Sequence, residues 1–179
     1  MSPSTKSDLA AIAFGLALSA AAIVPAFAAG GGGDPPPPPT CAKGQVYNAK
    51  KNSCVKAERG VLPDEEMTQY AYALAKEDRF QEALNVLDLL ENPNTAKALN
   101  YRGFATRKLG RTDEGISYYL KSVALDPNYA QVREYLGEAY VIQGKLDLAT
   151  SQLATIKTIC GTGCEEYEDL AQAIEDSKL

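Results

Sequence analysis

The stretch AKALNYRGFATRKLGRTDEGISYYLKSVALDPNY, residues 96–129, decides the fold, because many of its positions recur at a fixed interval. A shift of 34 residues brings identical residues into register. The matching pairs are Pro93/Pro127, Asn94/Asn128, Ala96/Ala130, Tyr101/Tyr135, Gly103/Gly137, Ala105/Ala139, Gly110/Gly144 and Asp113/Asp147. A constant period of this length predicts an array of stacked structural repeats.

Residues 96–129 resemble one complete tetratricopeptide repeat (TPR), a helix–turn–helix unit. In that resemblance Gly103 lies where the first helix approaches its neighbour closely, Gly110 lies at the inter-helix turn, and Tyr119 packs from the second helix. Residues 64–95 and 130–160 resemble less regular repeats, and the first of them has a shorter second helix. The resemblance implies an all-α fold, a TPR-type α-solenoid of about three repeats. A generic helical bundle is the alternative.

The end of the chain is predicted to form a capping helix over residues 165–179. Tyr167, Leu170, Ala171 and Ile174 follow the spacing of one apolar helical stripe. Thr162 stands three residues before Glu165, which matches a capping box and predicts Thr162 as the residue that caps the helix. We therefore expect a TPR domain over residues 60–179 that includes this helix.

The first 40 residues have the composition of export and spacer segments. A short polar start, an Ala-rich apolar run and an Ala26-Phe27-Ala28 cleavage pattern predict a signal peptide over residues 1–28. An uncleaved membrane anchor is the alternative. Residues 29–40 are rich in Gly and Pro and predict a disordered linker, either a spacer or a leader.

Four cysteines in an exported chain favour disulfides. The short separations favour the pairs Cys41–Cys54 and Cys160–Cys164, which would contribute about 3 and about 2 kcal/mol. A zinc site or a redox centre is less well supported, because the cysteines lack C-x2-C spacing. Cys41–Cys54 would staple a small hairpin over residues 41–59, placed to protect the first end of the repeat stack.

This hairpin is basic, with five cations against one anion between residues 41 and 59. It resembles short stapled hairpins of secreted proteins, some chitin-binding modules among them. A basic tip of this kind could touch an anionic envelope surface weakly or grip a polysaccharide. A solvated Lys-rich turn is the alternative.

The TPR resemblance also implies where a partner would bind, because the first helices of successive repeats line a concave groove. The predicted partner-binding set is Tyr72, Lys97, Asn100, Phe104, Arg107, Gln131, Glu134 and Glu138, with Glu65, Thr68, Ala75 and Val141 aligned to it. Tyr72 and Phe104 would be aromatic anchors, or would pack against neighbouring helices as core.

The charges of this set leave two interpretations. Lys97, Asn100 and Arg107 could hold a carboxylate, with Arg107 forming a bidentate pair. Glu134 and Glu138 lie one repeat away and would oppose an acidic peptide or engage the arginine internally. We therefore expect a groove of mixed charge rather than a plain carboxylate clamp.

Composition narrows the function classes further. The chain of 179 residues has no histidine, which removes histidine-based acid–base catalysis and histidine metal ligands. Its net charge of −5 argues against nucleic-acid binding. We expect a non-enzymatic protein-protein interaction scaffold that binds a protein or peptide partner in the bacterial cell envelope, with a periplasmic location and with no cofactor and no metal. The alternative is an envelope polysaccharide- or surface-binding module that uses the Cys41–Cys54 hairpin.

Overall fold

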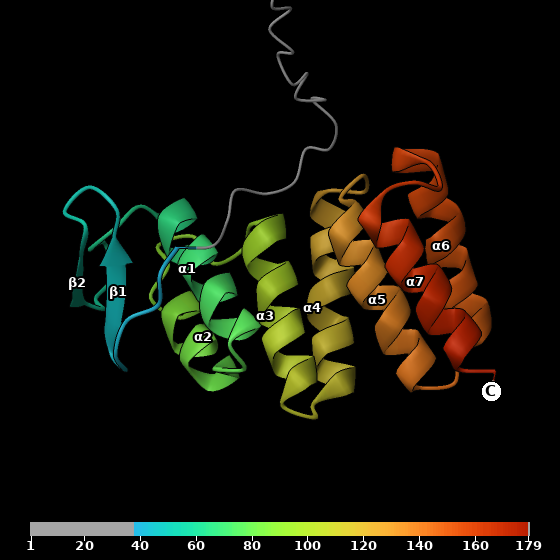
Figure 1. The fold of residues 1–179 in the computed structure, drawn as a ribbon, viewed down its shortest axis with the longest axis horizontal. Coiled ribbons are helices and arrows are strands. Elements are labelled where there is room, and N and C mark those ends of the chain that lie inside the picture. The colour runs from blue at the N-terminus through green and yellow to red at the C-terminus, as the bar shows by residue number, and fades with distance from the viewer. Residues whose placement is uncertain (1–37, 179) are drawn as a thin grey trace, which may run out of the picture. The chain divides into compact units, whose positions relative to one another are not determined.

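The computed structural model describes residues 38–178, so the predicted signal peptide and most of the predicted linker lie outside the described residues. Two short strands come first, followed by helices to the end (Figure 1). The strands are β1 (Gln45–Asn48) and β2 (Ser53–Lys56). The helices are α1 (Asp64–Lys76), α2 (Phe80–Leu87), α3 (Ala96–Lys108), α4 (Thr112–Leu125), α5 (Ala130–Ile142), α6 (Leu146–Cys160) and α7 (Glu165–Asp176). None of the helices in this part of the chain has the length and apolar character needed to cross a membrane.

The helices form pairs that stack in chain order, as the period predicts. α1 packs on α2, α3 on α4 and α5 on α6, and each odd-numbered helix also contacts the next odd-numbered one. The core runs continuously through these pairs, and its largest side chains include Tyr70, Tyr101 and Tyr119. The prediction of an all-α solenoid of three repeats with a capping helix is confirmed.

A left-handed backbone position ends the first helix of each pair. Gly110 and Gly144 have φ of 84° and 69° in the second and third pairs. Asp78 takes the same role in the first pair with φ of 59°, a conformation that aspartate tolerates better than most residues. The turn is therefore kept in all three pairs even though the sequence period is weaker in the first.

Two glycines allow helices to touch where the resemblance predicted a close approach. A Cβ atom at Gly103 would lie 2.6 Å from the ring of Tyr119 on α4 and 3.0 Å from the backbone oxygen of Gly115. A Cβ atom at Gly137 would overlap the side chain of Leu170 on α7. Gly103 thus closes the second pair, and Gly137 seats the capping helix on the third.

The stapled hairpin covers the first end of the stack, as predicted. The Cys41–Cys54 disulfide joins it, and β1 and β2 pair antiparallel with Val46 opposite Val55. Val46 is fully buried, and the backbone N–H of Cys41 donates to the Tyr70 hydroxyl at 2.7 Å. The hairpin is therefore part of the folded core and protects α1 and α2 from solvent.

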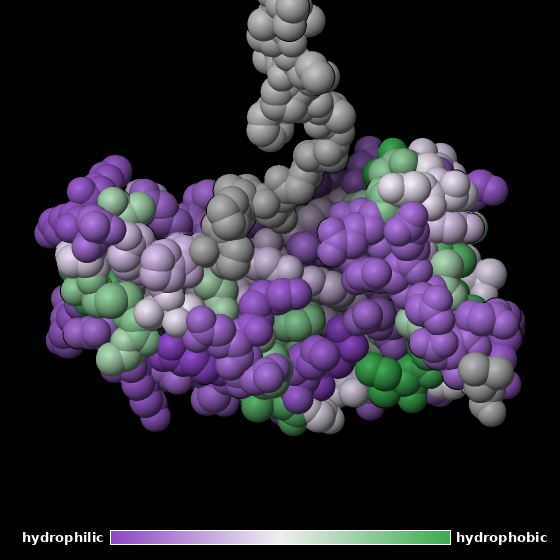
Figure 2. Space-filling view, in the orientation of Figure 1, coloured by the Kyte–Doolittle hydropathy of each residue, from purple (hydrophilic) through white to green (hydrophobic). Residues whose placement is uncertain are grey.

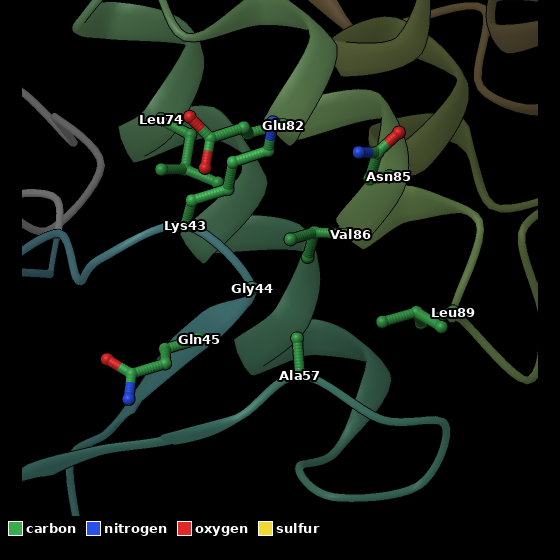
Figure 3. Close-up of a pocket in the computed structure, with 9 residues that line it drawn as sticks. All are labelled: Lys43, Gly44, Gln45, Ala57, Leu74, Glu82, Asn85, Val86 and Leu89. Atoms are coloured by element: carbon green, nitrogen blue, oxygen red, sulfur yellow. The ribbon is translucent and has the colours of Figure 1, made fainter.

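A small cavity of about 120 Å³ remains between the hairpin and these two helices (Figure 3). Its lining is largely apolar, with Leu74 and Val86 on the helix side. Lys43 extends from the hairpin toward Glu82 on α2 (Figure 3). The cavity is smaller than the usual sites for small organic ligands.

The shorter second helix of the first repeat is also confirmed, since α2 has 8 residues and α4 has 14. The segment after α2 is tied down by polar contacts instead. The Arg59 guanidinium donates to the carbonyl oxygens of Leu90 and Asp88 at 2.7 and 3.1 Å. The Asp64 carboxylate accepts from the backbone N–H groups of Glu91 and Asn92.

At the other end of the stack, the Cys160–Cys164 disulfide joins the end of α6 to the start of α7, as predicted. Leu170 and Ile174 of the predicted stripe are buried. The predicted capping box is wrong: the residue before α7 is Cys164, and no side chain caps the helix. Because α7 begins at Glu165, Thr162 lies two residues before the cap position and its hydroxyl does not cap the helix.

Candidate functional site

The predicted groove residues lie on α1, α3 and α5, the first helix of each pair. We call this surface the odd-helix face. It consists of Glu65, Thr68, Tyr72 and Ala75 on α1, Lys97, Asn100, Phe104 and Arg107 on α3, and Gln131, Glu134, Glu138 and Val141 on α5. Side chains from neighbouring odd helices meet on it, so the structure brings most of the predicted set together.

Polar contacts link the three helices across this face. Lys97 pairs with Glu65 at 3.0 Å, between α3 and α1. The hydrogen bond from Lys97 lowers the pKa of Glu65 below its ordinary value. The Asn100 amide donates to Gln131 Oε1 at 3.0 Å, between α3 and α5.

Arg107 is held inside the array rather than offered to solvent. Its guanidinium donates to Glu138 Oε2 at 2.6 Å and to the Tyr119 hydroxyl at 3.3 Å. Burial alone would lower the pKa of Arg107, but Tyr119 and Glu138 outweigh it and raise that pKa. The expectation that Glu138 engages the arginine internally is confirmed, and the odd-helix face carries mixed charge.

The two expected aromatic anchors behave differently. Phe104 is 8% exposed, and its ring centroid lies 5.0 Å from that of Tyr135, so it packs as core. Tyr72 is half-buried and stacks on Tyr101 with centroids 4.3 Å apart. Of the pair, only Tyr72 retains a partly exposed ring.

The accessible part of the face is therefore smaller than the predicted set. Asn100, Phe104, Arg107 and Glu134 are buried and join neighbouring helices or lie between them. The partly exposed members are Tyr72, Lys97, Gln131, Glu138 and Val141, with Glu65 more exposed. A partner that lies along this face would touch these side chains first.

Glu134 has an unusual environment near the end of the face. It is 7% exposed, and burial, followed by the charges of Glu138, Asp169, Glu166 and Glu165, raises its pKa to about 9. Three of these carboxylates belong to the first turns of α7. Sequence reasoning placed α7 as a cap and did not add these residues to the site.

The sequence separation between contacting residues points to these α7 carboxylates. Contacts between odd helices join residues 31 or 32 positions apart, as in Asn100–Gln131, Arg107–Glu138 and Glu65–Lys97. The same step of 31 leads from Glu134 to Glu165 and from Glu138 to Asp169. α7 thus extends the odd-helix face by one helix.

Metal ligation finds little support within residues 38–178. The one group there whose ligand atoms lie within 4.8 Å of one another is Cys160, Cys164 and Glu166. Both cysteines are joined in a disulfide and offer no thiolate.

No protein-family model matches the chain, and no curated protein matches it. Solved structures do match its fold. The first is MamA, with a TM-score of 0.54 and 19% identity over 65% of this chain and 69% of that one. The second is the Yersinia enterocolitica type III secretion chaperone SycD in complex with a peptide of the translocator YopD, with a TM-score of 0.54 and 17% identity over 67% and 97% of the two chains.

The third match is the second TPR domain of the human RPAP3 protein in complex with an HSP70 peptide. Its TM-score is 0.52, with 17% identity over 63% of this chain and 92% of that one. At such identities the likeness concerns the fold. Together with the period of 34 and the three stacked helix pairs, it establishes that this chain has the tetratricopeptide-repeat fold.

Proposed function

We propose that the chain is a non-enzymatic adaptor that binds a protein or peptide segment along the odd-helix face. The observation that carries this proposal is the row of partly exposed side chains that runs across α1, α3 and α5, whose helices are linked by ion pairs and hydrogen bonds. Such a surface offers polar and aromatic groups whose positions are fixed before binding. The peptides held by the SycD and RPAP3 structures support a partner of the same kind.

The proposed setting is the cell envelope. Two disulfides favour an oxidising compartment, since cytosolic thiols are kept reduced. The export signal that the sequence predicts over residues 1–28 supports the periplasm as that compartment. Catalysis is not part of the proposal, because the chain lacks histidine and its buried Arg107 is held in a contact between helices.

A second candidate function rests on the hairpin. Lys50 and Lys51 are exposed at its turn, while Val46 fixes its other side in the core. The turn would present two positive charges to an anionic surface.

One experiment separates these candidates. The tagged chain is crosslinked in envelope extract and the captured partner is quantified for variants of matched charge. Lys97→Glu should reduce capture of one discrete partner about fivefold, as expected for the loss of about 1 kcal/mol at a charged contact. Lys97 pairs with an exposed Glu65, so this variant should remain folded.

The control is Lys121→Glu, which makes the same charge change at an exposed position on α4. It should leave capture unchanged. An equal loss of capture in Lys97→Glu and Lys121→Glu would mean that net charge alone causes the effect. Unchanged capture in both variants would exclude the odd-helix face as the binding surface. Loss of capture only in the double variant Lys50→Ser/Lys51→Ser would show that the hairpin, and not the odd-helix face, binds the partner.

A further inference from the structure

The charge pattern along the odd-helix face changes at its last junction. Between α1 and α3, Glu65 is paired with Lys97, and between α3 and α5, Arg107 is paired with Glu138. Between α5 and α7 no ion pair occurs within residues 38–178, and the strongest charge effects on Glu134 come from carboxylates of α5 and α7. A basic side chain therefore forms an ion pair at the α1–α3 and α3–α5 junctions, whereas carboxylates gather at the α5–α7 junction without such a pair.

Glu134 itself is an unusual member of this junction. It is 7% exposed, and no hydrogen bond or ion pair involving its carboxyl occurs within residues 38–178. Burial of an unpaired carboxylate is costly, and the neighbouring negative charges add to that cost. The group therefore keeps a proton at neutral pH in the free protein, with a pKa of about 9.

The surface above this junction is hydrophilic. Figure 2 shows hydrophilic residues gathered over the start of α7 and the neighbouring α5. Glu165 and Asp169 are exposed, while Glu166 is half-buried. A charged group that approaches from solvent would meet these carboxylates, whose charges also act on the buried Glu134.

We propose that the α5–α7 junction receives the guanidinium of an arginine in the partner segment. This proposal rests on the adaptor function proposed above and names the chemistry of its partner. A guanidinium brings five N–H donors in a planar fork and so can serve several carboxylates at once. It would supply the positive charge that Lys97 and Arg107 supply at the other two junctions.

The positions of the carboxylates favour an extended organic cation over a metal ion. Within residues 38–178, Glu134 and its neighbours do not form a group whose ligand oxygens lie within 4.8 Å of one another. A calcium ion needs six to eight oxygens at about 2.3–2.6 Å. A guanidinium tolerates the wider separation, because its donors point outward in different directions.

Binding should release a proton from Glu134. A guanidinium beside the carboxyl lowers its pKa, so the proton passes to the solvent as the ion pair forms. The charged and titratable groups around it include Glu138 and Tyr135 on α5, Glu165, Glu166 and Asp169 on α7, Tyr119 on α4 and, through Glu138, Arg107 on α3. Arginine keeps its charge at every pH used, so the pH dependence of affinity reports Glu134.

In the experiment, the peptide acetyl-Leu-Arg-Leu-amide is added stepwise to the purified chain with both disulfides formed. Binding is measured from the NMR chemical shifts of the backbone amides. The matched peptide carries citrulline, which has the same shape without the charge. The arginine peptide should shift amides at the starts of α5 and α7 and bind about tenfold more tightly than the citrulline peptide. Its affinity should rise with pH by up to about tenfold per unit below the pKa of Glu134.

Variants assign the effect to a side chain. Glu134→Gln should weaken the arginine peptide about tenfold and remove the pH dependence. Glu168→Gln should change neither, because Glu168 is exposed and is not one of the carboxylates with the largest effect on Glu134.

Several results would overturn the proposal. These are equal binding of the two peptides, no amide shifts at millimolar arginine peptide, or unchanged binding to Glu134→Gln. Calcium chloride that shifts the same amides and displaces the peptide would make the junction a metal site instead. If Lys97→Glu reduces partner capture as expected while the arginine peptide fails to bind, the adaptor function stands and the arginine contact does not.

Discussion

Glu134→Gln is expected to raise the free energy of unfolding by about 3 kcal/mol at pH 7. The side chain of Glu134 is buried beside four other carboxylates, and folding raises its pKa from 4.5 to about 9. Glutamine has nearly the same shape and carries no charge at any pH. It therefore removes the cost of keeping an ionisable group at this position.

The sign of the pH dependence follows from proton binding. Between pH 4.5 and about 9 the folded chain holds a proton on Glu134 that the unfolded chain has lost. The free energy of unfolding therefore falls as pH rises through this window, by up to about 1.4 kcal/mol per unit. Below pH 4.5 both states are protonated, and the parent and the variant should be equally stable.

Urea unfolding of the two chains at several pH values measures this difference. The gain in Glu134→Gln should be small near pH 4.5 and should grow steadily toward pH 8. The exposed Glu168 is the control, and Glu168→Gln should change stability by less than about 0.5 kcal/mol. A variant that is less stable than the parent at pH 8 would show that Glu134 is ionised and paired in the folded chain.

Gly103→Ala is expected to destabilise the chain by about 2 kcal/mol or more. In an open helix the same change stabilises by about 0.5–1 kcal/mol, because alanine favours the helix. Here the new Cβ atom would lie 2.6 Å from the fully buried ring of Tyr119 and 3.0 Å from the backbone oxygen of Gly115. Neither the ring nor the backbone can retreat without separating α3 from α4.

Thermal or urea unfolding with Gly163→Ala as the matched control checks this prediction. A Cβ atom at Gly163 meets nothing within 4 Å, so alanine there should change stability by less than about 0.5 kcal/mol. Equal stability of Gly103→Ala and the parent chain would mean that α3 and α4 are less closely packed than in the structure.

Gly103 and Glu134 also show which features of the structure could be predicted from the sequence and which could not. The period of 34 and the glycine at 103 predict the helix pairs and their close contact, because both express a packing rule that repeats along the chain. The turn at Asp78 was less visible, since aspartate there replaces the glycines of the later repeats. The short α2 could be read from the reduced spacing, but its anchoring by Arg59 and Asp64 depends on contacts with distant loops.

The sequence predicted which helix face carries the candidate site, but not which of its side chains are exposed to solvent. The helix register places Asn100, Phe104 and Arg107 on the right face, yet neighbouring helices bury them. The stagger between stacked helices determines which of these side chains are covered, and this stagger follows from packing rather than from period. The same stagger brings α7 carboxylates near Glu134, while the local pattern at Thr162 indicated a cap that the structure does not form, because α7 begins only at Glu165.

Glu134 is expected to affect both the stability of the chain and the binding of its partner. A residue that lowers stability at neutral pH is readily replaced unless it has another use, since glutamine would fit the same space. Recognition of a cation is such a use, and the cost of the buried carboxyl would be recovered when the partner binds. The stability and peptide measurements on Glu134→Gln should therefore move in opposite directions.

We expect a partner segment to lie along the odd-helix face. A photo-crosslinking residue placed at Glu65 or at Lys97, in separate variants, tests it directly in envelope extract. Both positions should label the same discrete partner, and the exposed positions Lys121 on α4 and Thr150 on α6 should not. Labelling of that partner at Lys121 or Thr150, with none at Glu65 and Lys97, would contradict binding along the odd-helix face.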